Sequence, residues 1–225
     1  MKAVLWDVDG TLVSTKDLYL ECYRRALEPY MGKLLSDEEL FSLKPHHSEL
    51  RILRNHSGDA FEACISAFTE HYAVLHKTHF GGVYDGISET ISALRTRGIR
   101  NGIVTGKSRR SWEITLAEVE LGHFDVVIAD DDVADPKPHP EGILAALAAL
   151  DVPPEYALYV GDSPTDIQAA QAAGVSAAAA MWSKDEGWRH RFEAHTRDLP
   201  RFEMLEHPRD LFAIPGLLPD IDDQP

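Results

Sequence analysis

The sequence has little cysteine. Of its 225 residues only two are cysteines, Cys22 and Cys64, and they lie far apart with no CxxC spacing. A disulfide-stapled secreted domain and a structural zinc site are therefore both disfavoured. We expect two reduced thiols packed inside the protein.

Long hydrophobic runs are also missing. No stretch approaches the roughly 18 apolar residues that a membrane-spanning helix needs. The apolar run at residues 3–6 ends at Asp7 and is too short for the hydrophobic region of a signal peptide. The sequence therefore predicts a cytoplasmic protein with no membrane partner.

Basic residues are scarce relative to acidic ones. Lys and Arg number 22 against 37 Asp and Glu, which gives a formal net charge of −15. Basic side chains drive binding to the phosphate backbone, so a nucleic-acid partner is disfavoured. The same field would repel a phosphorylated small molecule. A site for such a substrate must therefore contain cationic groups or a metal ion of its own.

What the sequence does contain is an alternation of two patterns. Short apolar runs followed by polar or glycine-rich residues are typical of buried parallel strands. They occur at residues 3–6, 99–105, 124–129, 156–160 and, more weakly, 175–181. Apolar residues at helical spacing separate the later runs, at 87–94, 112–119, 143–150 and 167–173. This alternation predicts right-handed βαβ units and an α/β fold with a doubly wound, Rossmann-like parallel sheet.

The segment between the first two predicted strands is too long for one crossover, because connections usually take about 2–6 residues. Its apolar pattern is helical, and turns are expected at Pro29, Pro45 and residues 81–82. We therefore expect an inserted helical domain, which we call the predicted cap. The predicted division is a core at 1–13 and 81–215, the cap at 14–80 and a flexible tail at 216–225.

Ligands of an open α/β sheet bind outside the carboxyl ends of its strands, so the loops there are the places to look for chemistry. The first loop contains Asp7 and Asp9, which point to the same side because they are two residues apart. Two carboxylates that close repel unless a cation lies between them, and Mg²⁺ suits a site that also receives phosphate. Gly10 and Thr11 complete the loop and are assigned to substrate binding. A simple turn after a strand would contain the same residues.

The second loop follows the run at 99–105. Thr105 ends the strand, Gly106 allows a close approach of the backbone to a ligand, and Ser108 can cap the next helix. The free N–H groups of that helix start would then point at an anion. Taken alone, these residues favour a capped helix start without any ligand over a phosphate contact. Lys107 is expected to be solvated.

The third loop contains Lys137 between two prolines, Pro136 and Pro138. Prolines keep the chain extended and stiff, which restricts where the ammonium group can point. A fixed ammonium beside the carboxylates would neutralise charge on a transferring phosphoryl group. A solvated surface lysine is the alternative, and His139 is expected to be exposed.

The fourth loop contains Asp162 and Asp166. The run from Ser163 to Asp166 has the pattern of a capping box with Pro164 at the first helical position, which explains Asp166 structurally. Capping and support of a metal site are compatible. Asp162 has no such structural role in the sequence and is the better candidate for a metal ligand.

These loops together resemble those of the haloacid dehalogenase-like superfamily, in particular its phosphatases and mutases with a helical cap after the first strand, such as phosphoglycolate phosphatases and β-phosphoglucomutases. The resemblance covers nearly the whole chain. Its most specific parts are the Asp-Val-Asp-Gly-Thr motif at 7–11 and the Gly-Asp-Ser-Pro-Thr-Asp motif at 161–166.

The resemblance implies a role for each motif residue. Asp7 would be the nucleophile and a Mg²⁺ ligand, and Asp9 would be the general acid and base and give its backbone carbonyl to the metal. Thr105 and Lys137 would hold the phosphoryl group. Asp162 would bind Mg²⁺, and Asp166 would support the metal shell.

The sequence departs from the family pattern at two places. Many capped relatives have an acidic residue where Ser14 stands, and the segment 43–48 matches no substrate loop that we can assign. A potentially cationic cluster lies in this part of the predicted cap. We expect one or two of its members to bind the distal end of the substrate, although a solvated helix start fits equally well. The cluster comprises Lys44, His46, His47 and Arg51.

The expected function is Mg²⁺-dependent hydrolysis of a small phosphorylated metabolite through an aspartyl-phosphate, by a monomer or homodimer. A sugar-phosphate mutase would use the same core and remains the alternative. Dehalogenation is disfavoured, because those relatives lack the second aspartate and need no metal, whereas Asp9 and Asp162 are both present. A binding module on a decayed scaffold is less consistent with a complete set of charged residues.

Overall fold

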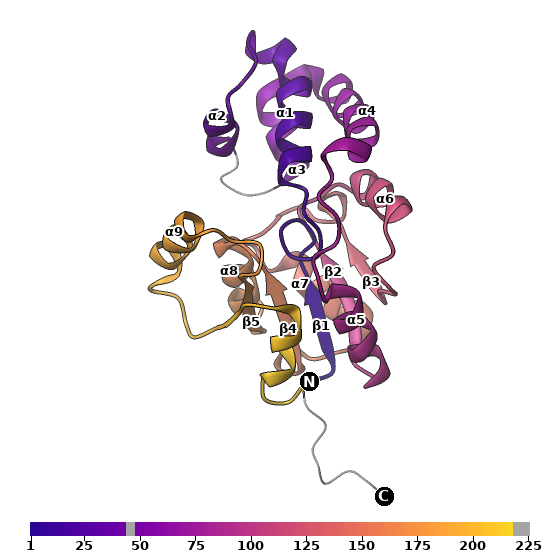
Figure 1. Ribbon diagram of the computed structural model, residues 1–225, viewed down its shortest axis with the longest axis vertical. Helices are drawn as coiled ribbons and strands as arrows, with labels where there is room; N and C mark the ends of the chain where they lie inside the picture. The colour runs from indigo at the N-terminus through magenta and orange to yellow at the C-terminus, as the bar shows by residue number, and fades with distance from the viewer. Residues whose placement is uncertain (44–47, 218–225) are drawn as a thin grey trace, which may run out of the picture.

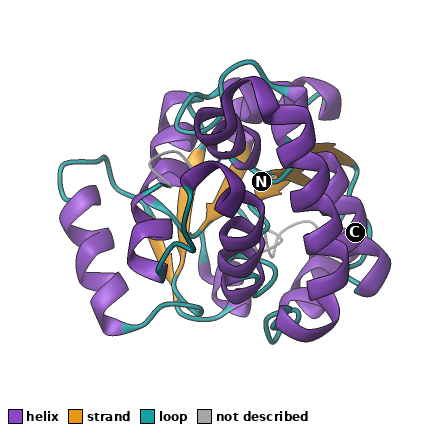
Figure 2. Cartoon of the chain, turned by 90° about the horizontal axis from the view of Figure 1, so that it is seen from above, coloured by secondary structure: helices purple, strands orange, loops and turns teal. Residues whose placement is uncertain are grey.

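One parallel sheet forms the centre of the protein. A computed structural model describes residues 1–43 and 48–217, and within them six strands pair in the order β3-β2-β1-β4-β5-β6. Figures 1 and 2 show this sheet with helices on either side. The strands are β1 (Ala3–Trp6), β2 (Arg100–Val104), β3 (Val126–Ile128), β4 (Ala157–Gly161), β5 (Ser176–Ala180) and β6 (Glu203–Leu205).

Both faces of the sheet are covered, which explains the continuous apolar runs. In β1, Ala3 and Leu5 belong to one buried cluster, whereas Val4 and Trp6 belong to a second. Successive side chains of a strand point to opposite faces, so the two clusters mark the two faces. The predicted fold class is therefore confirmed. The helices around the sheet are α5 (Ile87–Thr96), α6 (Arg109–Glu118), α7 (Glu141–Leu150), α8 (Pro164–Ala172) and α9 (Glu186–Thr196).

Each predicted strand is present; the first has its predicted ends, and the ends of the others are shifted by one or two residues. Among the strands and α-helices outside the predicted cap, two were not predicted. Strand β6 is only three residues long and partly exposed, and its apolar run of Met204 and Leu205 is too short to predict a strand. Helix α9 buries Phe192 and Thr196 but has charged residues over most of its surface, so its helical periodicity is weak.

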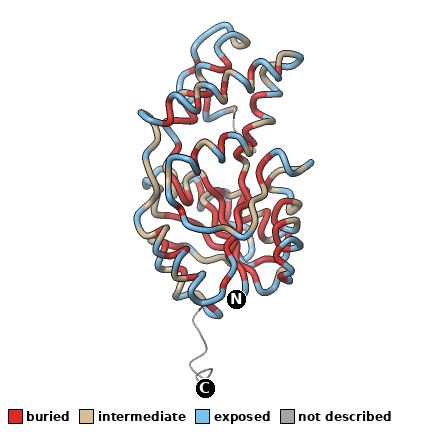
Figure 3. The backbone as a smooth tube through the Cα atoms, turned by 90° about the vertical axis from the view of Figure 1, so that its right-hand side faces the viewer, coloured by how far each residue is buried: buried red, intermediate tan, exposed pale blue. Residues whose placement is uncertain are grey.

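The described residues of the predicted cap form helices joined by short loops, with no strand among them. Figure 1 shows its helices standing over the carboxyl ends of the strands, at the end of the sheet away from the N-terminus. They share a hydrophobic cluster of their own, and Figure 3 shows buried segments inside both the sheet and this group. The helices are α1 (Lys16–Met31), α2 (Asp37–Ser42), α3 (Glu49–Ser57) and α4 (Phe61–His79). The division into core and cap stays a prediction.

The two cysteines lie in this cluster. Cys22 and Cys64 are both buried and unpaired. Burial raises the pKa of the Cys22 thiol to about 12, so it stays protonated and packs as a small apolar group. The expectation of two reduced, packed thiols agrees with this arrangement.

The chain passes twice between the sheet and the predicted cap, and the two passages lie side by side. Ser14 donates its backbone N–H to Gly82 over 2.9 Å, and Gly81 donates its own to Ser14 over 2.8 Å. A Cβ on Gly81 would lie only 2.6 Å from the Ser14 hydroxyl. The close approach therefore requires glycine at position 81.

Two expectations about turns and ends need correction. Pro29 does not mark a turn but lies in the last turn of α1, which ends at Gly32 in the left-handed conformation. The predicted tail begins too early, because Leu217 is buried beside the sheet and the Met1 ammonium donates to the Gly216 carbonyl over 2.7 Å. Pro45 and residues 218–225 lie outside the described residues.

None of the helices described in 1–43 and 48–217 combines the length and apolar character needed to cross a membrane.

Candidate active site

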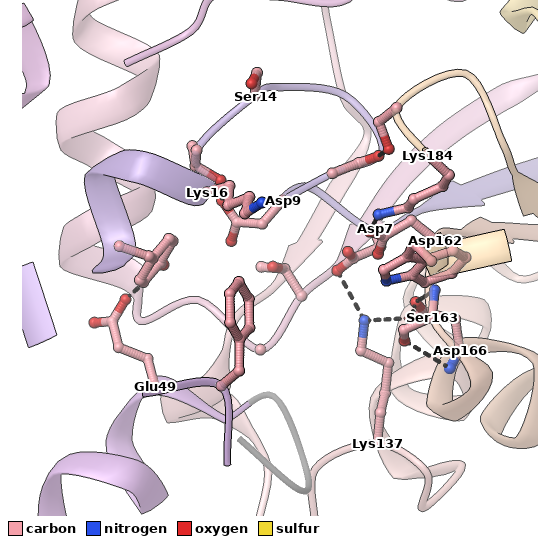
Figure 4. A pocket seen from close by; sticks show the side chains of 18 of the residues that line it. Asp7, Asp9, Ser14, Lys16, Glu49, Lys137, Asp162, Ser163, Asp166 and Lys184 are labelled. Carbon is pink, nitrogen blue, oxygen red and sulfur yellow. Dashed lines mark hydrogen bonds and ion pairs between the residues drawn. The ribbon is translucent and has the colours of Figure 1, made fainter. Parts of the chain in front are cut away.

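A pocket of about 760 Å³ opens above the carboxyl ends of β1, β2 and β4, on the side of α1 and α3. All four predicted loops contribute to its wall. Figure 4 shows Lys137 extending toward Asp7 and Asp166, with Asp162 nearby and Glu49 across the pocket. The predicted residues that line the pocket are Asp7, Asp9, Gly10, Thr105, Gly106, Lys137, Asp162 and Asp166.

Asp7 lies at the bottom of this pocket, directly after β1. Its backbone N–H donates to the Val160 carbonyl over 2.9 Å, and its side chain is almost fully buried. Burial raises the pKa of Asp7 to about 8, and although Lys137 acts in the opposite direction, the nearby acidic groups add to the increase. A carboxylate here needs more positive charge than the protein itself provides.

Lys137 is the buried cation of the site. Its Nζ donates to Asp7 Oδ1 over 2.8 Å and to Asp166 Oδ1 over 2.6 Å, and the Tyr159 hydroxyl lies 2.9 Å away. Burial alone would lower the pKa of Lys137, but Asp166 and Asp7 outweigh it and hold the pKa well above its usual value. The lysine is therefore charged and its position is fixed by several partners.

Asp166 is fully occupied by these contacts. Its Oδ1 binds Lys137, and its Oδ2 accepts from the backbone N–H of Ser163 over 2.9 Å and from the Ser163 hydroxyl over 2.6 Å. Ser163 caps α8 with Pro164 in its first turn, as the sequence predicts. Lys137 outweighs the effect of burial and lowers the pKa of Asp166. Asp166 thus orients Lys137. Both of its oxygens are already hydrogen-bonded, so none is left for a strong metal bond.

Asp162 faces Asp7 across the loop turn at Gly10. Gly10 has a φ of +81°, and a Cβ there would lie 2.2 Å from Asp162 Oδ2. The site therefore needs glycine for both conformation and space. The same Asp162 oxygen is paired with Lys184, which lies between β5 and α9.

Substitution of Gly10 by alanine should weaken Mg²⁺ binding about 10–100-fold, the usual cost of disturbing groups that orient metal ligands. The added methyl would displace the Asp162 carboxylate. Gly32→Ala is the matched control, because Gly32 has a φ of +69° but nothing within 4 Å of the added Cβ. Calorimetric titration with Mg²⁺ would compare the two variants. Equal affinities would contradict the expected contact.

Asp9 is turned away from this acidic group. Its Oδ1 accepts from the Thr15 hydroxyl over 2.6 Å and lies 3.0 Å from Lys107 Nζ. The acidic group at the bottom of the pocket consists instead of Asp7, Asp162 and Asp166, whose oxygens lie within 4.8 Å of one another. The side chain of Asp9 thus points to the cap side of the pocket.

The loop after β2 agrees in part with its prediction. Ser108 caps α6 by accepting from Ser111 N, and Thr105 and Gly106 line the pocket. The Gly106 carbonyl accepts from Glu49 N over 2.9 Å, which joins this loop to α3. The expectation of a solvated Lys107 is wrong, because its side chain is 0% exposed and lies under α1 and α4.

Two predicted substrate contacts, Thr11 and Arg51, are not brought into the pocket. Thr11 is fully buried beneath the loop and does not line the cavity. Arg51 does not face the pocket either, because its guanidinium donates to the Ala134 carbonyl and pairs with Asp135 at 3.1 Å. His46 and His47, with Lys44, lie outside the described residues. The ring of His139 is more than half exposed, as expected.

Comparison with known proteins agrees with this geometry. Residues 4–180 match the family model described as haloacid dehalogenase-like hydrolase. The chain belongs to the haloacid dehalogenase-like hydrolase family.

Relatives within this hydrolase family cover the whole fold. A pyrophosphatase PpaX of Bacillus cereus is 33% identical over 218 residues, which span 95% of this chain and 96% of the relative. CbbY from Rhodobacter sphaeroides, solved in complex with phosphate, is 26% identical with a TM-score of 0.75, over 94% of this chain and 96% of that one. A candidate phosphoglycolate phosphatase from Lactobacillus plantarum is also 26% identical, with a TM-score of 0.76, over 95% of this chain and 99% of that one.

Sequence reasoning missed the contribution of residues 182–184 to this hydrolase site. The Ser183 hydroxyl donates to the Gly10 carbonyl over 2.8 Å, and the Trp182 ring N–H donates to the Thr11 carbonyl over 3.0 Å. Lys184 reaches Asp162 from the same turn. The sequence did offer one indication of their role. They follow the weakest predicted strand, at 175–181, and therefore lie at the same edge of the sheet as the other site loops.

The residues present fit a magnesium ion. Asp7, Asp162 and Asp166 place three carboxylates beside two ammonium groups, those of Lys137 and Lys184, so with all three ionised negative charge exceeds positive charge at the bottom of the pocket. Carboxylate oxygens are the ligands that Mg²⁺ prefers, and a divalent ion would remove the excess. Asp7 and Asp162 are the carboxylates with an oxygen available for it.

Because burial raises the pKa of Asp7 to about 8, the metal-free protein should have Asp7 largely protonated at pH 7. A carboxyl group must lose its proton to bind a metal. Mg²⁺ binding at pH 7 should therefore release close to one proton, and the apparent affinity should rise between about pH 6 and pH 8. Titration calorimetry in buffers of different ionisation enthalpy measures this proton release. Binding without proton release would show that Asp7 is already ionised.

Proposed function

We propose that this protein is a Mg²⁺-dependent phosphatase that hydrolyses a small phosphate monoester through a phosphoenzyme on Asp7. One observation supports this above the others. Asp7 lies at the bottom of the pocket, 2.8 Å from the ammonium of Lys137, which Asp166 holds in place. A nucleophile beside a fixed cation is what the attack of a carboxylate on a phosphoryl group requires.

In the first step, a carboxylate oxygen of Asp7 forms a bond to phosphorus while the bond from phosphorus to the leaving oxygen breaks. Lys137 neutralises charge on the phosphoryl oxygens, and the Thr105 hydroxyl and nearby backbone N–H groups add hydrogen bonds. Mg²⁺ held by Asp7 and Asp162 would supply further neutralisation of the negative charge on the phosphoryl group. Asp9 donates a proton to the leaving oxygen.

In the second step, water attacks the aspartyl-phosphate and Asp9 takes up its proton. The bond between Asp7 and phosphorus breaks, phosphate leaves and the carboxylate is restored. Asp9 is suited to both steps because its side chain is 27% exposed and faces the cap side of the pocket. Asp7 cannot exchange protons with a leaving group in this way, since it is the group that attacks.

The size of the pocket bears on the substrate. A volume of about 760 Å³ extends from Asp7 to Phe41 of α2 and to Trp188 of α9, which leaves room for an organic leaving group. Inorganic pyrophosphate is the second candidate, because the Bacillus cereus relative is named a pyrophosphatase. It would fill only a small part of this space. A sugar-phosphate mutase stays an alternative, which stimulation by a sugar bisphosphate would reveal.

A screen of phosphorylated metabolites and pyrophosphate, with and without Mg²⁺, tests the proposal. We expect Mg²⁺-dependent release of phosphate and a labelled, acid-stable phosphoenzyme during turnover. Release without a phosphoenzyme would contradict Asp7 as the nucleophile, and no turnover of any phosphate compound would favour a binding role. The cytoplasmic location, the monomeric or homodimeric state and the division into core and cap stay predictions.

A further inference from the structure

Lys107 is a second buried lysine of the site, and the mechanism above gives it no role. Its ammonium is 0% exposed and lies 2.9 Å from the Tyr19 hydroxyl and 2.7 Å from the Tyr72 hydroxyl. It also lies over the ring faces of both tyrosines, 4.4 and 4.6 Å from the centroids. Tyr19 belongs to α1 and Tyr72 to α4, so side chains of the predicted cap enclose a lysine that belongs to the sheet.

A lysine this deeply buried costs free energy unless its charge is compensated. Burial alone would lower the pKa of Lys107, but Asp9, Tyr72 and Glu49 outweigh it and keep the ammonium charged. Asp9 is the nearest carboxylate, 3.0 Å from Nζ. Glu49 is linked to Lys107 through Tyr19, whose hydroxyl donates to the Glu49 carboxylate over 2.7 Å. The network thus connects the sheet to α1, α3 and α4 through one cation.

We propose that Lys107 is a positioning residue for Asp9, and that Tyr19 and Tyr72 hold Lys107 where it can act. The proposal rests on the proposed function, in which Asp9 is the general acid and base. Lys107 makes no contact with the Asp7 group at the bottom of the pocket and acts through the Asp9 carboxylate alone.

The arrangement of the two Asp9 oxygens supports this role. Thr15 and Lys107 both contact Oδ1, and within the described residues no group donates a hydrogen bond to Oδ2. With one oxygen held, the second is left for proton transfer. An in-line attack by Asp7 places the leaving oxygen on the opposite side of phosphorus, which is the cap side of the pocket. Lys107 therefore holds Asp9 on the side where the proton is needed.

The network also ties proton transfer to the position of the helices. The partners of Lys107 come from α1 and α4, whereas Lys107 itself follows β2. If these helices move away from the sheet, Lys107 loses both hydroxyls and becomes exposed to water. Asp9 is thus correctly oriented only when the pocket is covered.

Lys107→Met tests the proposal when phosphoenzyme formation is measured in single turnovers with two kinds of substrate. The alkoxide that leaves from an alkyl phosphate must be protonated as its bond to phosphorus breaks. The phenolate that leaves from an aryl phosphate with an acidic phenol is stable enough to leave almost without a proton. We expect the rate to fall about 100-fold or more for the alkyl ester, within the usual range for general acid catalysis, and only a few-fold for the aryl ester. Asp9→Asn should show the same selectivity, and combining both changes should add little to it.

Lys107→Met could lose stability because it leaves Glu49 without its cation. Lys107→Met combined with Glu49→Gln removes both buried charges and should fold while keeping the selective loss. Glu49→Gln alone is the matched control, and its ratio of the two rates should stay close to that of the wild type. Tyr72→Phe removes one partner of Lys107 and should give a smaller loss in the same direction.

Equal losses for both substrates in the folded double variant would overturn the proposal and leave Lys107 a purely structural residue. Unchanged rates would overturn it as well. Failure of the wild type to form a phosphoenzyme is a separate result, which would contradict the proposed function before Lys107 is examined.

Discussion

Asp7→Asn should lower the turnover of every phosphate substrate by at least about 10⁴-fold, because the loss of an attacking group typically costs four to six powers of ten. The amide is close in size to the carboxylate and keeps an oxygen for Lys137, so the fold should survive. Steady-state assays with Mg²⁺, together with trapping of the phosphoenzyme, measure this effect. Both turnover and the trapped phosphoenzyme should be lost together.

Asp151→Asn is a suitable control for this change. Asp151 is exposed, ends α7 with a φ of +52°, and occupies a left-handed conformation that asparagine tolerates well. This variant should retain wild-type activity. If Asp7→Asn kept full activity, another group would have to attack phosphorus, and the proposed function would lose its central residue.

Lys137→Ala should damage stability as much as activity. It would leave Asp7 and Asp166 buried without their shared cation, and loss of one member of a buried charged pair usually costs about 3–5 kcal/mol. For a chain of this size, that corresponds to a decrease in melting temperature on the order of 10 °C. Thermal unfolding monitored by circular dichroism measures the shift. Activity should fall below detection in the same sample.

Lys33→Ala provides the comparison for this loss. Lys33 pairs with Glu39 on the surface, and its side chain is 58% exposed, so its removal should cost less than about 1 kcal/mol. The double variant Lys137→Met with Asp166→Asn should recover much of the lost stability but no activity. It removes one buried positive charge and one buried negative charge together, so neither is left unpaired. A stable, inactive Lys137→Ala protein would mean that water or Mg²⁺ compensates the two carboxylates.

The sheet could be predicted because its signal is local. Residues 3–6 are apolar without interruption since the side chains of β1 are buried on both faces, and the same holds for β4. Strand β6 could not be predicted, because it is a three-residue edge strand that pairs only with β5 and its apolar run is limited to Met204 and Leu205. The length of the apolar run, rather than burial, separates β6 from the other edge strand, because residues 126–129 are apolar without interruption although β3 is only half-buried.

The two site lysines show where local reasoning ends. Lys137 is fixed by the stiff chain around it and by carboxylates that the sheet topology brings together, so its position follows from the sequence. Lys107 is buried by Tyr19 and Tyr72, which are 88 and 35 residues away. Arg51 was misassigned for the same reason, since Asp135 lies 84 residues along the chain. Packing between the predicted cap and the sheet decides these positions, and no short pattern contains it.

Both the stability and the activity of this protein are expected to depend on Lys137. This has a consequence for how the protein could change over evolutionary time. A descendant that no longer needed catalysis would still need Lys137, because losing it exposes the chain to unfolding and degradation. Asp162 carries no such constraint, since its side chain is partly exposed and its partner Lys184 can turn to water. Inactive descendants should therefore lose Asp162 long before Lys137. Retention of the lysine alone would be a sign of a stable fold and not of an enzyme.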